Sequence, residues 1–433
     1  MRRTAVIERV MVQRIGPRFL NLACLPAQVF MKAKAQPAPM DGPRLRRVLT
    51  SVPPLPQDAL EAAASVLASG HLFRYGEHAA EGTWVARLER AFAEHLGARF
   101  AVAVNSGGSA IHLAMRSLGI GPGDVVAMNA FTLAPVPGAV EHLGATVALV
   151  DIDEELRCDL DDLERCFVEQ QPTAFLLSHM RGHVADMDAI VALCTAHDVA
   201  LIEDCAHTLG ATYDGRPTGR FGVAGCFSLQ TWKQINAGEG GILVTDDEDL
   251  AARAILASGA YMLHAQHGTP PSEDVVQRWA ASTPNLSMRL NEVAAAVALP
   301  QLATLEERNA RWRAIHDRLA SGLANLPGLR LPVALPQVLP APTSLQFVAD
   351  LPAEVLRASL DACAARGVQI KWFGRDRPVG FTSTHRNWGY VPSRSLPKGD
   401  GVLAGLCDVR LPADLSDEDV DTIVAVVRLA FGH

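Results

Sequence analysis

The chain alternates between short apolar runs and amphipathic segments from residue 100 to residue 245. The apolar runs have the length of strands, and the segments between them repeat apolar residues at helical spacing. This pattern predicts strands at 101–104, 125–128, 147–150, 175–177, 200–202, 222–228 and 242–245, and helices at 59–69, 85–96, 109–118, 134–142, 160–168 and 187–197. Because continuous Val, Ile, Leu and Phe runs are typical of strands buried on both faces, we predict an α/β fold with a mostly parallel sheet between layers of helices.

The pattern changes near residue 300. A long helix with repeated Arg and Glu is predicted at 301–323, and a Pro-rich stretch and a smaller α+β segment follow it. The last helix, 417–431, has a clear start, because Ser416 stands at its capping position before acidic residues. We therefore predict a large domain over residues 48–300 and a small C-terminal domain over residues 301–433.

Composition and charge exclude several classes of protein. Hydrophobic residues make up 49% and charged residues 20% of the 433 residues, which excludes a disordered or fibrous chain. The net charge of −8 is uneven, because residues 1–47 contain ten basic and two acidic side chains and the rest contains 29 basic and 45 acidic ones. The chain after residue 47 is too acidic to bind nucleic acid well, because binding to phosphate groups requires basic side chains. We interpret residues 1–47 as an extension outside the fold, either disordered or read from an early start codon, with Met40 as an alternative start.

Apolar length and cysteine spacing exclude further classes. No apolar run reaches the roughly 18 residues that a membrane span needs, so we expect no association with a membrane. The eight cysteines form no Cys-x-x-Cys pair and no metal-ligand spacing with histidine. Scattered thiols are typical of a reduced, cytoplasmic protein, and we predict no metal site.

Three groups of residues follow predicted strands, at the sheet edge where ligands of parallel sheets bind. The first is a Gly/Ser turn at 105–110 before a helix, where free backbone amides can hold a phosphate group. In the second, Asp204 ends a buried strand, where its carboxylate can face a ligand and hold a proton on it. In the third, Lys233 is the only Lys or Arg inside the stretch 221–252. Its surroundings are apolar and flanked by glycine, so burial would lower its pKa and make its amine nucleophilic.

Each of these groups has an ordinary structural interpretation when it is considered alone: a turn without a ligand, a helix-capping carboxylate and a surface lysine. Together they match pyridoxal 5′-phosphate, which needs a phosphate-binding turn, a carboxylate that keeps its pyridine nitrogen protonated and a lysine for a Schiff base. A flat side chain against the ring is also needed. Phe131, after the next strand, is the candidate, and a core phenylalanine is its structural alternative.

The chain resembles the DegT/DnrJ/EryC1/StrS sugar aminotransferases, which have the type I aspartate aminotransferase fold, over most of residues 55–430. The resemblance rests on six motifs in order: Asn-Ser-Gly-Gly-Ser-Ala-Ile-His-Leu-Ala (105–114), Gly-Pro-Gly-Asp (121–124), Asp-Ile-Asp (151–153), Ala-Asp-Met-Asp (185–188), Ile-Glu-Asp-Cys-Ala-His (202–207) and Cys-Phe-Ser…Lys…Gly-Glu-Gly-Gly (226–241). It implies Lys233 as the Schiff-base lysine and Asp204 as the partner of the pyridine nitrogen. It also implies His207 near the cofactor's phenolic oxygen and Phe131 stacked on the ring. The phosphate ligands that it implies are Gly108, Ser109 and Ser228.

One motif departs from the family pattern. Relatives often show an Asn-aromatic-Arg-Met-x-Glu motif, whose asparagine reaches the cofactor phosphate of the neighbouring subunit. Alignment on Arg289 puts Ser287 at the asparagine position, with Asn285 two residues earlier. We take Asn285 as the candidate cofactor-binding residue, and the resemblance implies a homodimer with shared active sites.

The resemblance implies a two-stage amino transfer. An amino group would pass from glutamate or glutamine to the cofactor and then to a ketone, usually a nucleotide-linked keto-deoxysugar or a related cyclic ketone. Lys233 would move the proton between the two carbons involved. Two alternatives stay open: dehydration or deoxygenation on the same scaffold, where histidine replaces the lysine in known cases, and a non-catalytic cofactor-binding regulator. The presence of lysine favours transamination.

Overall fold

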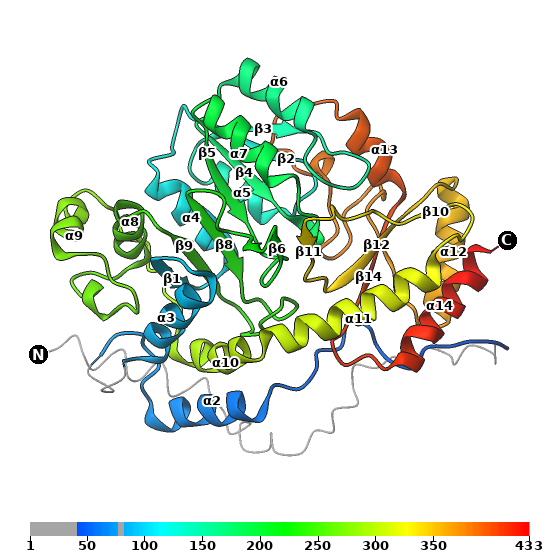
Figure 1. Cartoon of the computed structure of the whole chain (residues 1–433), viewed down its shortest axis with the longest axis horizontal. Helices are drawn as coiled ribbons and strands as arrows, with labels where there is room; N and C mark the ends of the chain where they lie inside the picture. The colour runs from blue at the N-terminus through cyan, green and yellow to red at the C-terminus, as the bar shows by residue number, and fades with distance from the viewer. Residues whose placement is uncertain (1–40, 77–81, 433) are drawn as a thin grey trace, which may run out of the picture. The chain divides into compact units, whose positions relative to one another are not determined.

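A seven-stranded sheet lies at the centre of the structure, which is a computed structural model describing residues 41–76 and 82–432 (Figure 1). Its strands are β1 (Phe100–Val104), β2 (Val125–Asn129), β3 (Thr146–Val150), β4 (Ala174–Ser178), β5 (Ala200–Asp204), β8 (Ala224–Ser228) and β9 (Gly241–Thr245), in the order β1-β9-β8-β5-β4-β2-β3. Strands β3, β2, β4, β5 and β8 form a parallel ladder, and β9 runs antiparallel to both of its neighbours. The predicted α/β fold with a mostly parallel sheet is confirmed.

Helices cover both faces of this sheet (Figure 1). They are α2 (Gln57–Ser69), α3 (Trp84–Leu96), α4 (Gly107–Ser117), α5 (Pro135–Glu141), α6 (Leu160–Gln170), α7 (Met187–Ala196), α8 (Glu248–Ser258), α9 (Glu273–Ala280) and α10 (Glu292–Ala303). Alternate residues of β1 enter separate cores: Val102 and Val104 share one with α4 and α8, whereas Ala101 and Ala103 share another with α3 and α10. This double burial explains why the strands read as continuous apolar runs. Among the described helices, none combines the length and the apolar character that a membrane crossing requires.

A second sheet is built from the C-terminal third of the chain. Its antiparallel strands are β10 (Leu329–Arg330), β12 (Ser344–Ala349), β13 (Lys371–Trp372) and β14 (Leu406–Arg410), in the order β10-β12-β14-β13. The remaining elements are a small sheet of β11 (Val338–Leu339), β6 (Thr212–Tyr213) and β7 (Arg216–Pro217), the helices α11 (Leu305–Leu323), α12 (Ala353–Ala365), α13 (Pro397–Gly405) and α14 (Asp417–Phe431), and the 3-10 turns η1 (Met180–Gly182), η2 (His264–Gln266) and η3 (His385–Asn387). Ser416 caps α14 as predicted, because its hydroxyl accepts a hydrogen bond from the Asp419 N–H. Residues Pro43–His433 form one compact unit, so the division near residue 300 stays a prediction.

The segment before α2 packs into the core of the second sheet. Leu45 and Leu49 are buried there, and the Leu45 N–H donates a 2.9 Å hydrogen bond to the Arg366 carbonyl. A Cβ on Gly367, whose φ is +89°, would lie 2.1 Å from the Leu45 carbonyl oxygen, so glycine is needed for this contact. The end of the predicted extension therefore belongs to the fold, because its leucine fills an apolar core. Residues 1–40, including the alternative start at Met40, lie outside the described residues.

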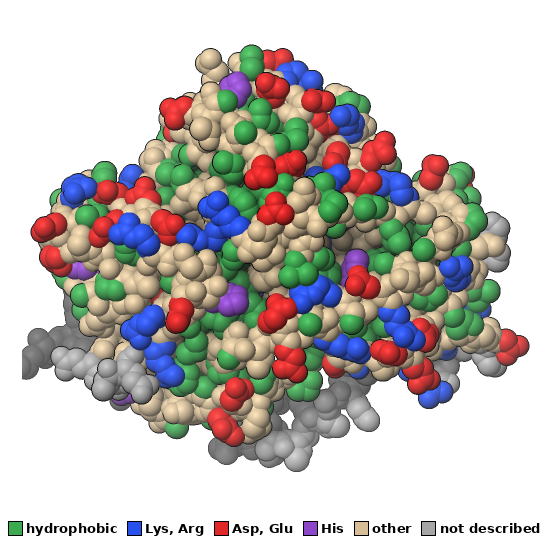
Figure 2. Space-filling model, in the orientation of Figure 1, with side chains coloured by type: hydrophobic (Ala, Val, Ile, Leu, Met, Phe, Trp, Pro, Cys, Tyr) green, Lys and Arg blue, Asp and Glu red, His purple; other side chains and the backbone are tan. Residues whose placement is uncertain are grey.

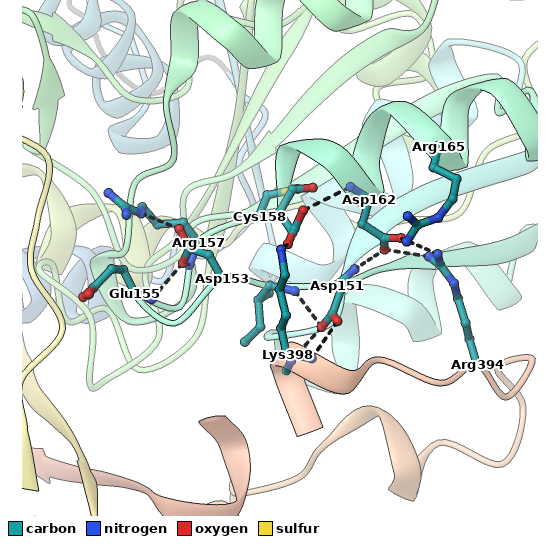
Figure 3. Close-up of polar contacts among 12 residues, drawn as sticks. Asp151, Asp153, Glu155, Arg157, Cys158, Asp162, Arg165, Arg394 and Lys398 are labelled. Atoms are coloured by element: carbon teal, nitrogen blue, oxygen red, sulfur yellow. Dashed lines mark hydrogen bonds and ion pairs between the residues drawn. The ribbon is translucent and has the colours of Figure 1, made fainter. Parts of the chain in front are cut away.

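A polar clamp joins the carboxyl end of β3 and the start of α6 to Arg394 and to the first turn of α13 (Figure 3). Both carboxylate oxygens of Asp162 bind the Arg394 guanidinium, and the Lys398 ammonium pairs with Asp159. The Asp151 carboxylate accepts the Lys398 N–H at 3.0 Å and the Gly399 N–H at 2.8 Å. The clamp thus fixes the chain that leads through α13 into β14, at the edge of the first sheet.

Candidate active site

A cavity of about 350 Å³ lies where the carboxyl ends of β4, β5 and β8 meet the N-terminus of α4 and two strands of the second sheet. Its volume lies in the range that is usual for small-molecule sites. It brings together five of the residues predicted from the sequence: Gly108, Asp204, His207, Ser228 and Lys233. Because parallel strands end at one edge, residues far apart in the sequence converge there.

The turn between β1 and α4 forms one end of the cavity. The Ser106 hydroxyl caps α4 by accepting a 3.0 Å hydrogen bond from the Ser109 N–H, and Gly107 begins the helix. A Cβ on Gly107 would lie 3.0 Å from the Ser228 Cβ, so this glycine lets the helix start approach the end of β8 closely. The positive end of the helix dipole and the Ser228 hydroxyl together suit a phosphate group.

Ser109 does not line the cavity. Its hydroxyl donates a 2.6 Å hydrogen bond to the Asn105 amide oxygen and lies 2.9 Å from the Ser106 hydroxyl. Its side chain is therefore engaged within the turn, and Ser106 takes the place on the cavity wall.

Lys233 and His207 form a contact pair. The Lys233 Nζ lies 2.9 Å from the His207 Nε2. Burial, reinforced by the positive charge of Arg181, lowers the pKa of Lys233 to about 7. Burial, together with Lys233, also holds the pKa of His207 well below its usual value, so this imidazole is neutral at neutral pH. The lowered pKa is the one expected from the sequence, and it would leave the Lys233 amine partly neutral near pH 7, as a nucleophile or a base must be.

Asp204 is fixed at the end of β5. One of its oxygens accepts a 2.7 Å hydrogen bond from the Ser178 hydroxyl, and the other accepts one of 3.1 Å from the Ala206 N–H. The Ser178 hydroxyl in turn accepts a 2.8 Å hydrogen bond from the Thr132 hydroxyl. The carboxylate is thus held in one orientation on the cavity wall, where it can accept a hydrogen bond from a protonated nitrogen.

The structure places Phe131 outside the cavity. Its ring is buried in a separate apolar cluster and contacts the Phe373 ring edge to face, with 5.5 Å between the ring centroids. The next two residues, Thr132 and Leu133, line the cavity instead. The chain bends over residues 130–132, so a shift of one residue here exchanges a core position for a cavity position.

Asn285 and Ser287 lie on the surface and do not line this chain's cavity. The Asn285 amide oxygen accepts a 3.1 Å hydrogen bond from the Ser287 N–H, and Ser287 has a φ of +55°. The role assigned to Asn285 requires a second subunit, so it stays a prediction.

Sequence reasoning missed three cations on the cavity wall: Arg181, Lys371 and Arg410. Arg181 lies in η1, three residues after β4, and so fits the rule that residues after strands reach the site. Lys371 and Arg410 come from β13 and β14, and the sequence carries no signal that places the second sheet against the first.

Among the described residues, one group has the geometry of potential metal ligands: His179, Glu203 and Cys205. Both oxygens of Glu203 are already engaged, since they accept hydrogen bonds from the N–H groups of Gly219, at 2.8 Å, and Phe221, at 2.7 Å. The neighbouring carboxylates Glu203 and Asp204 thus point to opposite sides of β5, and Glu203 holds the loop before β8.

Comparisons with known proteins agree with this geometry. A family model described as the DegT/DnrJ/EryC1/StrS aminotransferase family matches residues 57–428. Among solved structures, the aminotransferase TlmJ from Streptoalloteichus hindustanus is 28% identical, with a TM-score of 0.76 over 89% of this chain and 99% of that one. DesV from S. venezuelae is 30% identical, with a TM-score of 0.73 over 90% and 98%. The 3-amino-5-hydroxybenzoic acid synthase is 25% identical, with a TM-score of 0.76 over 90% and 100%.

Proposed function

This chain belongs to the DegT/DnrJ/EryC1/StrS aminotransferase family, and from that premise we propose that it uses pyridoxal 5′-phosphate to move an amino group from glutamate or glutamine to a ketone. The ketone is a nucleotide-linked keto-deoxysugar or a related cyclic ketone. One observation carries the proposal: a half-buried lysine with a pKa of about 7 shares a cavity with a fixed carboxylate and a helix N-terminus.

The residues present fit the cofactor. The start of α4 with Ser228 would hold the phosphate, Asp204 the protonated pyridine nitrogen, and Lys233 the aldehyde carbon. The Nδ1 of His207 is buried and has no hydrogen-bond partner among the described residues, which leaves it free for a polar group of a ligand. When it is bound, pyridoxal 5′-phosphate supplies an electron sink for the bond that breaks at the substrate carbon.

The chain's own residues do the proton work. Lys233, once free of the cofactor, is a base whose pKa of about 7 suits both uptake and release of a proton near neutral pH. Its neighbour His207 is neutral and lies at hydrogen-bond distance, so it orients the amine without competing for positive charge. Trp232, directly before the lysine, lines the cavity and contacts Phe381 with 5.4 Å between the ring centroids, which gives the substrate an aromatic wall.

A homodimer is part of the proposal. Phe73, Tyr261, Met262 and Leu286 are exposed apolar side chains. The Arg289 guanidinium lies over the rings of Phe73 and Tyr261, at 5.4 and 5.9 Å from their centroids. An exposed apolar group of this kind is typical of a protein interface.

This apolar surface adjoins the phosphate-binding turn. The Asn105 N–H, at the start of that turn, donates a 2.9 Å hydrogen bond to the Met288 carbonyl. A second copy docked on the surface would therefore lie next to the turn, as shared active sites require. Size-exclusion chromatography with light scattering should give the mass of a dimer.

The test of the function is the first half-reaction. Wild-type holoenzyme mixed with L-glutamate should lose the absorbance of the lysine-bound cofactor and gain that of the pyridoxamine form. Lys233→Ala should slow this conversion by roughly a thousandfold or more, because both the Schiff base and the proton carrier are lost. Lys233→Arg is the matched control, since it keeps a positive charge but forms no Schiff base, and it should be equally slow.

The two alternatives predict different results. Against the first alternative, the proposal requires that at least one common amino donor converts the cofactor to the pyridoxamine form, and failure with all of them would favour other chemistry on the same scaffold. A regulator would keep its physiological activity in the Lys233→Ala variant. Either result would contradict the proposed transamination.

A further inference from the structure

One wall of the cavity carries more positive charge than the chain balances. Arg181, Lys371 and Arg410 all line it, and together with Asp408 we call them the cavity cluster. The Asp408 Oδ2 lies 3.3 Å from the Arg181 Nη2 and 3.4 Å from the Lys371 Nζ. Its Oδ1 accepts a 2.7 Å hydrogen bond from the Gln346 side-chain amide. Arg181 and Lys371 thus share one carboxylate, and Arg410 adds a third positive charge to the same wall.

Arg181 is held rigidly at this wall. Only 5% of the residue is exposed, and its backbone lies in the left-handed region, with φ 59° and ψ 12°. Residues with a Cβ rarely adopt this conformation outside sites where the surrounding structure imposes it. The Nε of Arg181 is buried and has no hydrogen-bond partner among the described residues. One donor of this buried guanidinium thus has no acceptor among the described residues.

The other two cations are crowded as well. Burial, reinforced by Arg181, lowers the pKa of Lys371 to about 8 and the pKa of Arg410 to about 10. Burial alone would raise the pKa of Asp408, but Arg181 and Lys371 hold it at about 2, so this carboxylate is ionised. An additional anion between the three cations would relieve their mutual repulsion.

A planar carboxylate fits this arrangement, because a guanidinium offers two parallel N–H groups to its two oxygens. Arg410 also lies against the indole of Trp232, with 5.4 Å between its guanidinium carbon and the ring centroid. A ring that bears a carboxylate could therefore lie along Trp232 with its charged group at the cations.

The two half-reactions of an aminotransferase use the same cavity in turn, because the amino group enters and leaves at one atom of the cofactor. An amino-acid donor brings a carboxylate to the cavity. A neutral acceptor would leave the three cations with Asp408 as their one counter-anion in the second half-reaction, whereas an anionic acceptor would add a second. On the basis of the proposed function, we propose that Arg181, Lys371 and Arg410 bind a carboxylate of the acceptor, and that the acceptor is a carboxylated cyclic ketone.

The test compares two acceptors that differ in charge and hardly in shape: 3-oxocyclohexane-1-carboxylate and its neutral carboxamide. Holoenzyme is first converted to the pyridoxamine form with L-glutamate and freed of excess donor. The return of the lysine-bound absorbance is then followed with each ketone. In the wild type, the second-order rate constant should be about 100-fold higher for the carboxylate than for the carboxamide.

Substitution of the cations should remove this preference. In Arg181→Gln and in Arg410→Gln the ratio of the two rate constants should fall below about fivefold, whatever the change in each rate constant alone. Arg181→Lys should restore part of the ratio. Arg278→Gln, at an exposed position on α9, is the control and should leave the ratio unchanged.

Equal rates with both ketones in the wild type would overturn the inference, and so would a ratio that survives both Gln variants. Variants that slow only the glutamate half-reaction would show that the cluster serves the donor alone, which also overturns it. If no donor gives the pyridoxamine form, the proposed function fails instead. Calorimetric titration of the holoenzyme with the same two ketones then still tests the site, because the carboxylate should bind more tightly to wild type and not to Arg181→Gln.

Discussion

Two buried charge clusters in this chain differ in how completely their charges are balanced. In the first, which we call the α3 cluster, Arg74 donates hydrogen bonds of 3.0 Å to each oxygen of Glu89. The His267 Nδ1 lies 3.0 Å from the same carboxylate, and burial lowers the pKa of this histidine, so it stays neutral. One cation therefore meets one anion. The cavity cluster has three cations and one carboxylate, Asp408, which pairs with Arg181 and Lys371.

The environment of the two clusters explains the difference. Backbone N–H groups of Ala103 and Gly268 donate the remaining hydrogen bonds to Glu89, each at 2.9 Å, so the chain itself engages the whole carboxylate, and only the Nε of Arg74 lacks a partner among the described residues of this cluster. Arg74 and Glu89 are fully buried and hold α3 against β1 and the loop after η2. The cavity cluster is open on one side. We therefore interpret the α3 cluster as structural and the cavity cluster as the proposed binding site for an anionic ligand.

The largest expected effect follows from breaking the balanced pair. Arg74→Met leaves the buried Glu89 without its cation, and it should lower the free energy of unfolding by about 3–5 kcal/mol. Denaturant unfolding of the holoenzyme, followed by tryptophan fluorescence, measures this. The double variant with Glu89→Gln should recover part of the loss, because the orphaned charge is removed. A loss below about 1 kcal/mol in the single variant would show that the pair does not carry the stability inferred here.

Removal of a cation from the unbalanced cluster should behave differently, and its effect should depend on pH. The pKa of Lys371 is about 8 in the folded chain, against 10.5 for an ordinary lysine, so the unfolded chain binds more protons between these values. Wild type should therefore gain stability relative to Lys371→Met as the pH rises from 8 to 10, by on the order of 2 kcal/mol. At pH 7 the variant should be as stable as wild type or more so.

Thermal melts of both proteins from pH 7 to pH 10 give this difference. A relative stability of wild type that is flat or falls with pH would show that Lys371 is not crowded by its neighbours. Arg386→Met, an exposed cation that pairs with Asp400, serves as the control and should show no such trend.

The smallest effect is expected at the surface, where acidic and basic side chains are intermixed over the face shown in Figure 2. Arg278 pairs with Asp249 at 2.8 Å, but both side chains are largely exposed to water. Arg278→Ala should change the free energy of unfolding by less than about 0.5 kcal/mol, because solvent screens such pairs. The same denaturant titration tests it, and a loss comparable to that of Arg74→Met would mean that burial does not set the difference between the pairs.

The sequence predicts the part of the site that parallel strands assemble. Asp204, His207, Ser228 and Lys233 each follow a strand of one sheet, and the carboxyl ends of those strands meet at one edge. Their convergence follows from local pattern and topology alone. Phe131 shows the limit of that reasoning, because the direction of a side chain just past a strand depends on a register that apolar runs do not specify to one residue.

The rest of the site depends on contacts between elements that are distant in sequence. Lys371 and Arg410 lie on short strands of the second sheet, and only the packing of that sheet brings them to Lys233. Arg181 has a left-handed backbone conformation that the sequence does not predict, because arginine has no preference for this conformation. The balance of charge in a cluster is thus a property of the folded chain.

The two leucines before α2 have a practical consequence for producing the enzyme. Leu45 and Leu49 fill the core beneath the second sheet, which also carries Lys371 and Arg410. A recombinant chain that begins at residue 41 keeps both leucines, whereas one that begins at Leu55 would open an apolar slot beside α12 and α14. In the shorter chain this apolar surface would be exposed to water, and the protein would be more prone to aggregate. A chain produced for experiments should therefore keep both leucines, although they precede Lys233 by more than 180 residues in the sequence.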